Sequence, residues 1–265
     1  MVFAVPQEKV ASLVRLFAQE DVEATVIGRF VRSGLLRLFF RDEEVGTIDL
    51  EFLHEGLPRR TLVAVYERRQ HQKAVVDDVD VKEVALQMLR LPTVGSKEAV
   101  VRQYDHEVIG QTVLKPLVGV ESGGPSDAVV LKPLPDRWEG VAVGCGINPW
   151  YGIEDPSAMA GCCIEEAVRN VVAVGSDPDR IAILDNFCWG NVRDEKELGS
   201  LVRCVLGCRK AAVSYGVPFI SGKDSLNNFF VGEDGSVVSI PGTLLISAIG
   251  IVPDVRRIVS SDLKR

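Results

Sequence analysis

The feature that most constrains the fold is an alternation of short apolar runs with long amphipathic stretches between residues 128 and 251. Apolar runs at 128–131 and 141–145 are predicted to be strands. Asp155-Pro156 then supplies an N-cap and a residue suited to the first helical turn, and the helix that follows stops at Gly175. Strands that alternate with helices indicate an α/β domain.

The alternation continues toward the end of the chain. The further predicted elements are a strand at 181–184, a helix at 195–215 that Gly216 ends, and strands at 217–220 and 243–251. Polar segments follow the first and second of these strands, at Asp185-Asn186 and at residues 221–228. Ligands bind at the carboxyl ends of strands in many α/β sheets, so we expect the two segments to line one crevice.

The N-terminal part reads as a separate α+β piece. An amphipathic helix is predicted at 6–20, with Pro6 in its first turn. A hairpin of strands at 24–30 and 35–40 and a third strand at 45–50 follow. Residues 59–98 read as a partly folded connector, whose charged run at 67–73 is typical of a solvated helix face.

Composition restricts the class of protein. The 265 residues are 46% hydrophobic and 25% charged, as expected for a globular protein with a sizeable core. A net charge of −7 and 6% aromatic residues argue against nucleic-acid binding. The sequence shows no targeting segment and no apolar run long enough for a membrane span, which favours a cytoplasmic protein.

The cysteines do not indicate a metal site. The chain has six cysteines without Cys-x-x-Cys spacing and without neighbouring histidines, so a zinc site is not expected. Cys163, Cys204 and Cys208 fall on or beside apolar helix faces. We expect them to be buried, reduced thiols.

Residues 221–225, Ser-Gly-Lys-Asp-Ser, carry the strongest chemical signal. A glycine lets backbone N–H groups approach a phosphate, Lys223 neutralises its charge, and Asp224 can hold a divalent ion. The segment is not a P-loop, because five residues separate Gly216 from Gly222 where that motif has four, and no Ser or Thr follows the lysine. A plain surface turn is the competing interpretation.

Other polar groups have structural explanations as well as functional ones. Glu165 and Arg169 form an i,i+4 pair that steadies any exposed helix. Glu166 and Asn170 also lie one turn apart, a spacing that lets two oxygen atoms meet one magnesium ion, although helix decoration explains it equally well. His106 stands in a dense polar setting, and we predict a structural role for it.

Five segments together resemble the phosphoribosylformylglycinamidine synthase family of the aminoimidazole ribonucleotide synthetase superfamily. They stand in the family's order at 103–106 (Gln-Tyr-Asp-His), 124–128 (Gly-Pro-Ser-Asp-Ala), 166–170 (Glu-Ala-Val-Arg-Asn), 185–191 (Asp-Asn-Phe, then Gly-Asn) and 221–225. The resemblance implies a partial C-terminal-type domain at 1–58, a connector at 59–98, an ATP-binding-type domain at 99–255 and a tail at 256–265. It also implies a mixed sheet with helices on one side.

The family's reaction is ATP-dependent amidation of formylglycinamide ribonucleotide to formylglycinamidine ribonucleotide in purine biosynthesis, with ammonia from glutamine. The implied cofactors are ATP and Mg²⁺. By the same resemblance, nucleotide contacts are expected from Ala128, Asp185, Gly222 and Lys223, substrate contact from Ser225, and magnesium contacts from Glu166, Asn170 and Asp224. Glu166 and Asn170 match positions that hold magnesium beside a second, non-catalytic nucleotide in the large form of the enzyme. Because phosphoryl transfer relies on positioning and charge neutralisation, these residue types suit the chemistry.

The chain also departs from the family. Lys223 and Asp224 stand where the small form of the enzyme has Asn and Val, and we hypothesise that the Lys223 ammonium replaces one metal contact on the phosphate. Phe229 stands where many relatives have Glu. The family's catalytic histidine lies in a half that this sequence lacks, so the chain resembles an internal fragment or one member of a split enzyme, inactive alone.

The resemblance sets the expected partners. They are the missing N-terminal half, a glutaminase that supplies ammonia, and a second copy of the chain bound through an exposed sheet face. One alternative is a non-catalytic half that holds an auxiliary nucleotide. Another is a different enzyme of the superfamily, such as a selenophosphate, thiamine-phosphate or hydrogenase-maturation protein, although those lack the preceding domain tail and connector.

Overall fold

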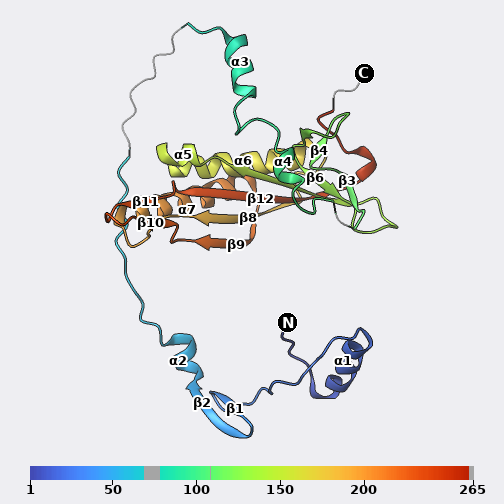
Figure 1. Cartoon of the computed structure of the whole chain (residues 1–265), viewed down its shortest axis with the longest axis vertical. Helices are drawn as coiled ribbons and strands as arrows, with labels where there is room; N and C mark the ends of the chain where they lie inside the picture. The colour runs from blue at the N-terminus through green and yellow to red at the C-terminus, as the bar shows by residue number, and fades with distance from the viewer. Residues whose placement is uncertain (69–77, 108, 263–265) are drawn as a thin grey trace. The chain divides into compact units, whose positions relative to one another are not determined.

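The computed structural model describes residues 1–68, 78–107 and 109–262, in two compact units that divide at Thr61 (Figure 1). The charged run predicted at 67–73, and the tail at 256–265, therefore lie partly outside the described residues. The helices of the described chain are α1 (Gln7–Gln19), α2 (Leu50–Glu55), α3 (Val81–Leu89), α4 (Glu98–Val101), α5 (Pro149–Glu154), α6 (Pro156–Ala173), α7 (Glu195–Tyr215) and a 3-10 turn (Val255–Arg257). None of them is long and apolar enough to cross a membrane.

The first unit contains α1, α2 and a hairpin of β1 (Leu35–Phe40) and β2 (Glu43–Asp49). The helix predicted at 6–20 is confirmed, but the predicted strand at 24–30 is wrong. The hairpin instead turns at Arg41 and Asp42, both with positive φ (48° and 67°), as the favoured two-residue hairpin turn requires. No residue of this unit is buried, so it has no core of its own.

The second unit is built on a mixed six-stranded sheet with the order β3-β6-β7-β12-β8-β9. Its strands are β3 (Thr112–Leu114), β6 (Val129–Leu131), β7 (Gly140–Ile147), β12 (Thr243–Val252), β8 (Ile181–Cys188) and β9 (Phe219–Ser225). Only the β8–β9 pair is parallel. Small hairpins pair β4 (Leu117–Val118) with β5 (Gly124–Pro125) and β10 (Phe229–Val231) with β11 (Val237–Ser239).

Helices α6 and α7 pack on each other and on one face of this sheet (Figure 1). Along β12, residues Leu244, Ile246 and Ala248 are fully buried on that face, whereas the alternate side chains of the strand are only half-buried. We call the first face the helix-covered face and the opposite one the open face. The mixed sheet with helices on one side, expected above, is confirmed.

The close approach of α6 to the sheet depends on glycine. A Cβ atom on Gly146 of β7 would lie 2.1 Å from the carbonyl oxygen of Cys163 on α6. Any larger residue there would push the helix off the strand. The predicted N-cap is confirmed, because the Asp155 carboxylate accepts hydrogen bonds from the backbone N–H groups of Ser157 and Ala158 at 2.8 and 3.3 Å.

The two long helices bury the cysteines that sequence analysis placed inside. Cys163, Cys204 and Cys208 are buried free thiols between α6 and α7, as predicted. Burial raises the pKa of Cys163 to about 11, and a hydrogen bond with Cys208 and then burial raise the pKa of Cys204. The thiols of Cys163 and Cys204 are therefore protonated and unreactive at neutral pH.

Candidate functional site

The two polar segments predicted to meet do meet, but as strands rather than as loops. β8 runs on through Asp185 to Cys188, and β9 contains the whole segment from Ser221 to Ser225. The prediction that these residues form loops after the strands is therefore wrong. The strands pair in parallel, with Asp185 opposite Gly222 and Asn186 opposite Lys223.

Side chains in the two strands alternate between the faces of the sheet. Asp185 lines a groove with Phe187 and residues of α7, so it points to the helix-covered face. Gly222 and Asp224 share that face, because they pair with Asp185 and Phe187. Lys223 and Ser225 therefore point to the open face, where the Lys223 ammonium hydrogen-bonds the Ser225 hydroxyl.

A bulge sets which residues face which way. Phe219 pairs with Ile183, but the next pair along is Ser221 with Leu184, so Ile220 is an extra residue in β9. One extra residue reverses the alternation of every side chain that follows it. The bulge thus sends Lys223 to the open face and Asp224 to the helix-covered face, to which Asp185 of β8 also points.

The groove beside Asp185 has a volume of about 660 Å³. Its walls are mainly apolar and come from β8, β9 and α7, with Asp185 and Arg209 as its charged side chains. Burial, and then the nearby charge of Asp224, raise the pKa of Asp185. A Cβ atom on Gly222 would lie 2.5 Å from an Asp185 carboxylate oxygen, so the glycine makes room for this carboxylate.

The side chains of Glu166 and Asn170, both on α6, hydrogen-bond the backbone at the end of β7. The backbone N–H of Ile147 donates to Glu166 Oε2 at 2.9 Å, and Asn170 Nδ2 donates to the carbonyl of Cys145 at 2.8 Å. Each side chain keeps one further oxygen atom, Oε1 or Oδ1, that can accept another ligand. The predicted pair of Glu165 and Arg169 is also present, with Nε 2.7 Å from Oε1.

The three predicted magnesium contacts fall in two places. Glu166 and Asn170 lie over β7, whereas Asp224 lies on β9, three strand spacings or about 14 Å across the sheet. Oxygen ligands of one Mg²⁺ stand about 2 Å from the ion, so these groups do not share an ion. Within the described residues, no three His, Cys, Asp or Glu side chains are grouped closely enough to hold a metal.

Ala128 lies in the core instead of on a surface. Its side chain is 5% exposed, and a Cβ on Gly144 of β7 would lie 3.4 Å from it. Its carbonyl accepts a hydrogen bond from the Ser126 hydroxyl at 2.8 Å. Any contact of Ala128 with a nucleotide therefore has to use the backbone.

Sequence analysis missed Trp189, which fixes the ends of both site strands. It is 1% exposed, and its indole N–H donates to the Ser200 hydroxyl of α7 at 2.7 Å. Its backbone N–H donates to the Ser225 carbonyl at 2.8 Å, and its own carbonyl accepts from the Asn228 N–H at 2.9 Å. A lone tryptophan after a strand is the one signal that the sequence offered.

The connector also contributes to the second unit. The Val65 N–H donates to the Glu195 carbonyl at 2.9 Å, the Tyr66 ring lies under the Arg203 guanidinium at 5.5 Å, and Glu67 is 3.3 Å from Lys196. We call residues 65–67 the strap. It forms part of the wall of a cavity of about 800 Å³, which contains none of the residues predicted to bind nucleotide, substrate or magnesium.

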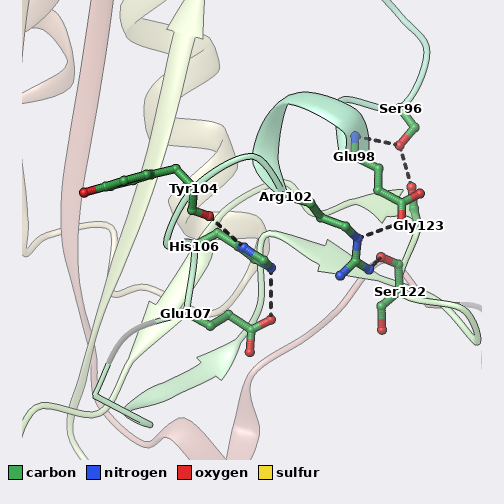
Figure 2. Close-up of polar contacts among 8 residues, drawn as sticks. All are labelled: Ser96, Glu98, Arg102, Tyr104, His106, Glu107, Ser122 and Gly123. Atoms are coloured by element: carbon green, nitrogen blue, oxygen red, sulfur yellow. Dashed lines mark hydrogen bonds and ion pairs between the residues drawn. The ribbon is translucent and has the colours of Figure 1, made fainter.

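The segment around His106 is a polar network at the start of the second unit. Figure 2 shows Arg102 between Glu98 and the Ser122 carbonyl, with bonds of 2.7 and 3.0 Å, and the Tyr104 ring pointing away from the other side chains. His106 Nδ1 lies 3.2 Å from the Tyr104 carbonyl, and Nε2 lies 3.7 Å from Glu107. Both contacts of His106 are with residues next to it in the chain, and its structural role stays a prediction.

Comparisons with known proteins agree with this fold. A family profile described as "AIR synthase related protein, N-terminal domain" matches residues 125–252. The chain is 32% identical to "Phosphoribosylformylglycinamidine synthase subunit PurL" of Thermomicrobium roseum over 98% of its length and 34% of the relative's. The PurL subunit of Picrophilus torridus is 29% identical over 92% of this chain and 32% of its own length.

Among solved structures, PurLQS from Thermotoga maritima matches 97% of this chain and 38% of that chain, with a TM-score of 0.71 at 19% identity. Thermotoga maritima PurL complexed with ATP matches 96% of this chain and 37% of that chain, with a TM-score of 0.63 at 18% identity. These structural matches establish the fold. The chain spans about a third of the length of the relatives it matches.

Proposed function

We propose that this chain, a homologue of the PurL subunit over nearly its whole length, is the part of a phosphoribosylformylglycinamidine synthase that carries its second ATP-binding-type domain. The observation that carries the proposal is the extent of the match, 32% identity over 98% of the chain. The reaction would be the ATP-dependent amidation of formylglycinamide ribonucleotide. The chain takes part in it together with the rest of the enzyme and a glutaminase, in the cytoplasm.

Two features of the described residues support nucleotide binding. Lys223 and Ser225 on the open face offer an ammonium and a hydroxyl to a phosphate group. Glu166 and Asn170, on the helix that covers the other face of the sheet, each keep one oxygen atom for a cation that would accompany a second nucleotide. Thermotoga maritima PurL has been solved in complexes with ATP and with FGAR, which are the ligands we propose for the assembled enzyme.

In this arrangement the protein's own contribution is positioning and charge neutralisation. The bonds of Glu166 and Asn170 to the β7 backbone hold their free oxygen atoms in place before a cation arrives. Mg²⁺, when bound there, would offset the charge of the polyphosphate of that second nucleotide. Lys223 would hold phosphate oxygens on the open face.

Calorimetry with the 265-residue chain tests the nucleotide part of the proposal. We expect ATP to bind in the presence of Mg²⁺, and to bind more weakly when EDTA removes the cation. Lys223→Ala should weaken MgATP binding, and unchanged affinity would contradict the role given to Lys223. Arg180→Ala, on the loop before β8, is the matched control and should leave the affinity unchanged.

Reconstitution tests the enzymatic part. The chain, mixed with the remaining two-thirds of a PurL relative and an ammonium salt, should convert ATP to ADP only when formylglycinamide ribonucleotide is present. ADP that stays bound through purification, without turnover in the reconstituted mixture, would instead support the non-catalytic alternative.

A further inference from the structure

Two neighbouring rungs of the sheet carry polar side chains on the open face. Asn186 lies opposite Lys223 in the first rung, and Cys188 lies opposite Ser225 in the second. Thr243 of β12 pairs with Cys188 and extends the second rung. We call these residues, Asn186, Cys188, Thr243, Lys223 and Ser225, the polar patch.

The polar patch differs from the rest of the open face. Toward the opposite end of the same strands, the side chains that share this face are apolar, namely Val141, Val143, Ala182, Ile249 and Ile251. Neighbouring strands are about 4.8 Å apart and alternate residues about 7 Å apart, so the patch spans roughly 10 by 7 Å, with Leu245 of β12 beside Asn186 at its apolar corner. That area fits one phosphate group or a diphosphate.

The charge of the patch is positive. Lys223 is its one charged side chain, because Asp224, next to it in sequence, and Asp185, on the neighbouring strand, point to the helix-covered face. The Asn186 side chain accepts a weak hydrogen bond from the Cys188 thiol at 3.6 Å through Oδ1, and within the described residues its Nδ2 has no protein partner. The patch therefore offers free donors and no carboxylate, which suits an anion.

We propose that the polar patch binds a phosphate group, and that Asn186, Cys188 and Thr243 belong to this binding site beside Lys223 and Ser225. The proposal rests on the proposed function, which supplies two ligands with this chemistry, a nucleotide and a ribonucleotide substrate. Asn186 Nδ2 donates to a phosphate oxygen, and the Thr243 hydroxyl, which donates to the Pro241 carbonyl at 2.8 Å, borders the site. The bound phosphate covers the Cys188 thiol.

The cysteines provide a direct measurement of where the ligand binds. Cys188 is half-buried in the patch, and Cys145 is exposed on the same open face, roughly 16 Å away across two strand spacings and along the strands. Cys163, Cys204 and Cys208 are buried. With Cys162→Ser removing the remaining exposed thiol, N-ethylmaleimide labelling of Cys188 and Cys145 can be followed by peptide mass spectrometry.

We expect ligand at ten times its Kd to slow labelling of Cys188 about tenfold, because only about a tenth of the molecules are then free. Labelling of Cys145 should stay the same. Separate arms with MgADP and with ribose 5-phosphate distinguish the two sources of phosphate. The ligand that protects Cys188 from labelling is the one that binds the polar patch.

The outcomes separate the two proposals. If calorimetry shows that MgADP or ribose 5-phosphate binds, and Cys188 reacts at its original rate, the polar patch is not the binding site and the proposed function stands. If neither ligand binds the chain, both proposals fall.

A substitution provides a second test on folded protein. Asn186→Ala should weaken binding of the ligand that protects Cys188 by about tenfold or more, the effect of losing one hydrogen bond to a charged group. Ser247→Ala, on the same face in the rung of Cys145, is the matched control and should bind normally. Equal affinities of the Asn186→Ala and Ser247→Ala proteins would overturn the proposal.

Discussion

Asp185 and Lys223 stand beside each other in the sheet and act on opposite sides of it. Asp185 pairs with Gly222, the residue before Lys223, so the two residues are diagonal neighbours on adjacent strands. Their side chains lie on opposite faces of the sheet, which separates the two charges. A phosphate on the open face would meet the ammonium without meeting the carboxylate. The separation removes the repulsion that a carboxylate in the same site would cause.

Asp185 also makes a testable contribution to stability. Burial, and then the charge of Asp224, raise its pKa above the ordinary value of 3.8. A carboxyl whose pKa is higher in the folded state favours folding when protonated, and that contribution is lost as the pH rises through the folded-state pKa. Asp185→Asn should therefore stabilise the protein at pH 7, by less than about 1 kcal/mol, and have little effect near pH 3.8.

Urea unfolding of both proteins at pH 7 and pH 4 measures this difference. The gain should be smaller in an Asp224→Asn background, because one of the two causes of the raised pKa is then gone. An Asp185→Asn protein that is less stable than the parent at pH 7 would show that the ionised carboxylate has a stabilising partner.

At the scale of elements, the ends of the long helices could be predicted and the ends of the site strands could not. Asp155-Pro156 and Gly216 mark helix boundaries by local chemistry, and both act as predicted, with Gly216 at φ 69°. The polar residues from Asp185 to Cys188 and from Ser221 to Ser225 read as loops because strand prediction relies on apolar residues. Their strand conformation comes from pairing with each other, which no local signal reports.

The faces of the site residues were equally beyond local prediction. Knowing that Lys223 and Asp185 meet at one sheet edge required only the strand order, but knowing that they face apart required the bulge at Ile220. The prediction of a hairpin strand at 24–30 failed for a related reason. Its residues are apolar enough for a strand, but the turn that closes a hairpin lies at Arg41 and Asp42.

The strap gives a prediction at this scale. A Cβ on Gly199 of α7 would lie 2.0 Å from the Val65 carbonyl oxygen and 2.9 Å from the Tyr66 nitrogen, both backbone atoms that cannot swing aside. Gly199→Ala should therefore displace the strap from α7 while the helix stays intact. Hydrogen exchange of the Val65 amide, which donates to Glu195 in the parent, should become at least about tenfold faster, the effect of losing 1.4 kcal/mol of protection.

Gly161→Ala is the matched control, because a Cβ at this position in α6 meets nothing within 4 Å. It should leave the Val65 amide protected and stabilise the protein by up to about 1 kcal/mol, since alanine favours helix more than glycine does. Unchanged exchange of Val65 in the Gly199→Ala protein would mean that the strap is not held at this point.

At the scale of the whole molecule, the apolar half of the open face sets the expected behaviour in solution. Val143, Ile249 and their neighbours form a contiguous apolar surface on the sheet. Surfaces of this kind are usually covered by another protein surface. We predict that the isolated chain self-associates at micromolar concentration, which sedimentation velocity measures.

Val143→Lys should shift the sedimentation profile toward monomer, because a charge in the middle of the apolar surface opposes its burial. Leu206→Lys, at a position on α7 that is 57% exposed, controls for the added charge and should leave the profile unchanged. A parent chain that sediments as a clean monomer would contradict the prediction.

The extra residue at Ile220 has a consequence for how proteins with this sheet can diverge. If Ile220 instead paired in regular register and the bulge were lost, every later residue of β9 would turn to the other face of the sheet, with Asp224 outward and Lys223 inward. A surface that attracts anions would then repel them, without one substitution among the residues that make contact. Mutations that decide whether β9 bulges at Ile220 can thus silence the site or change its preferred ligand.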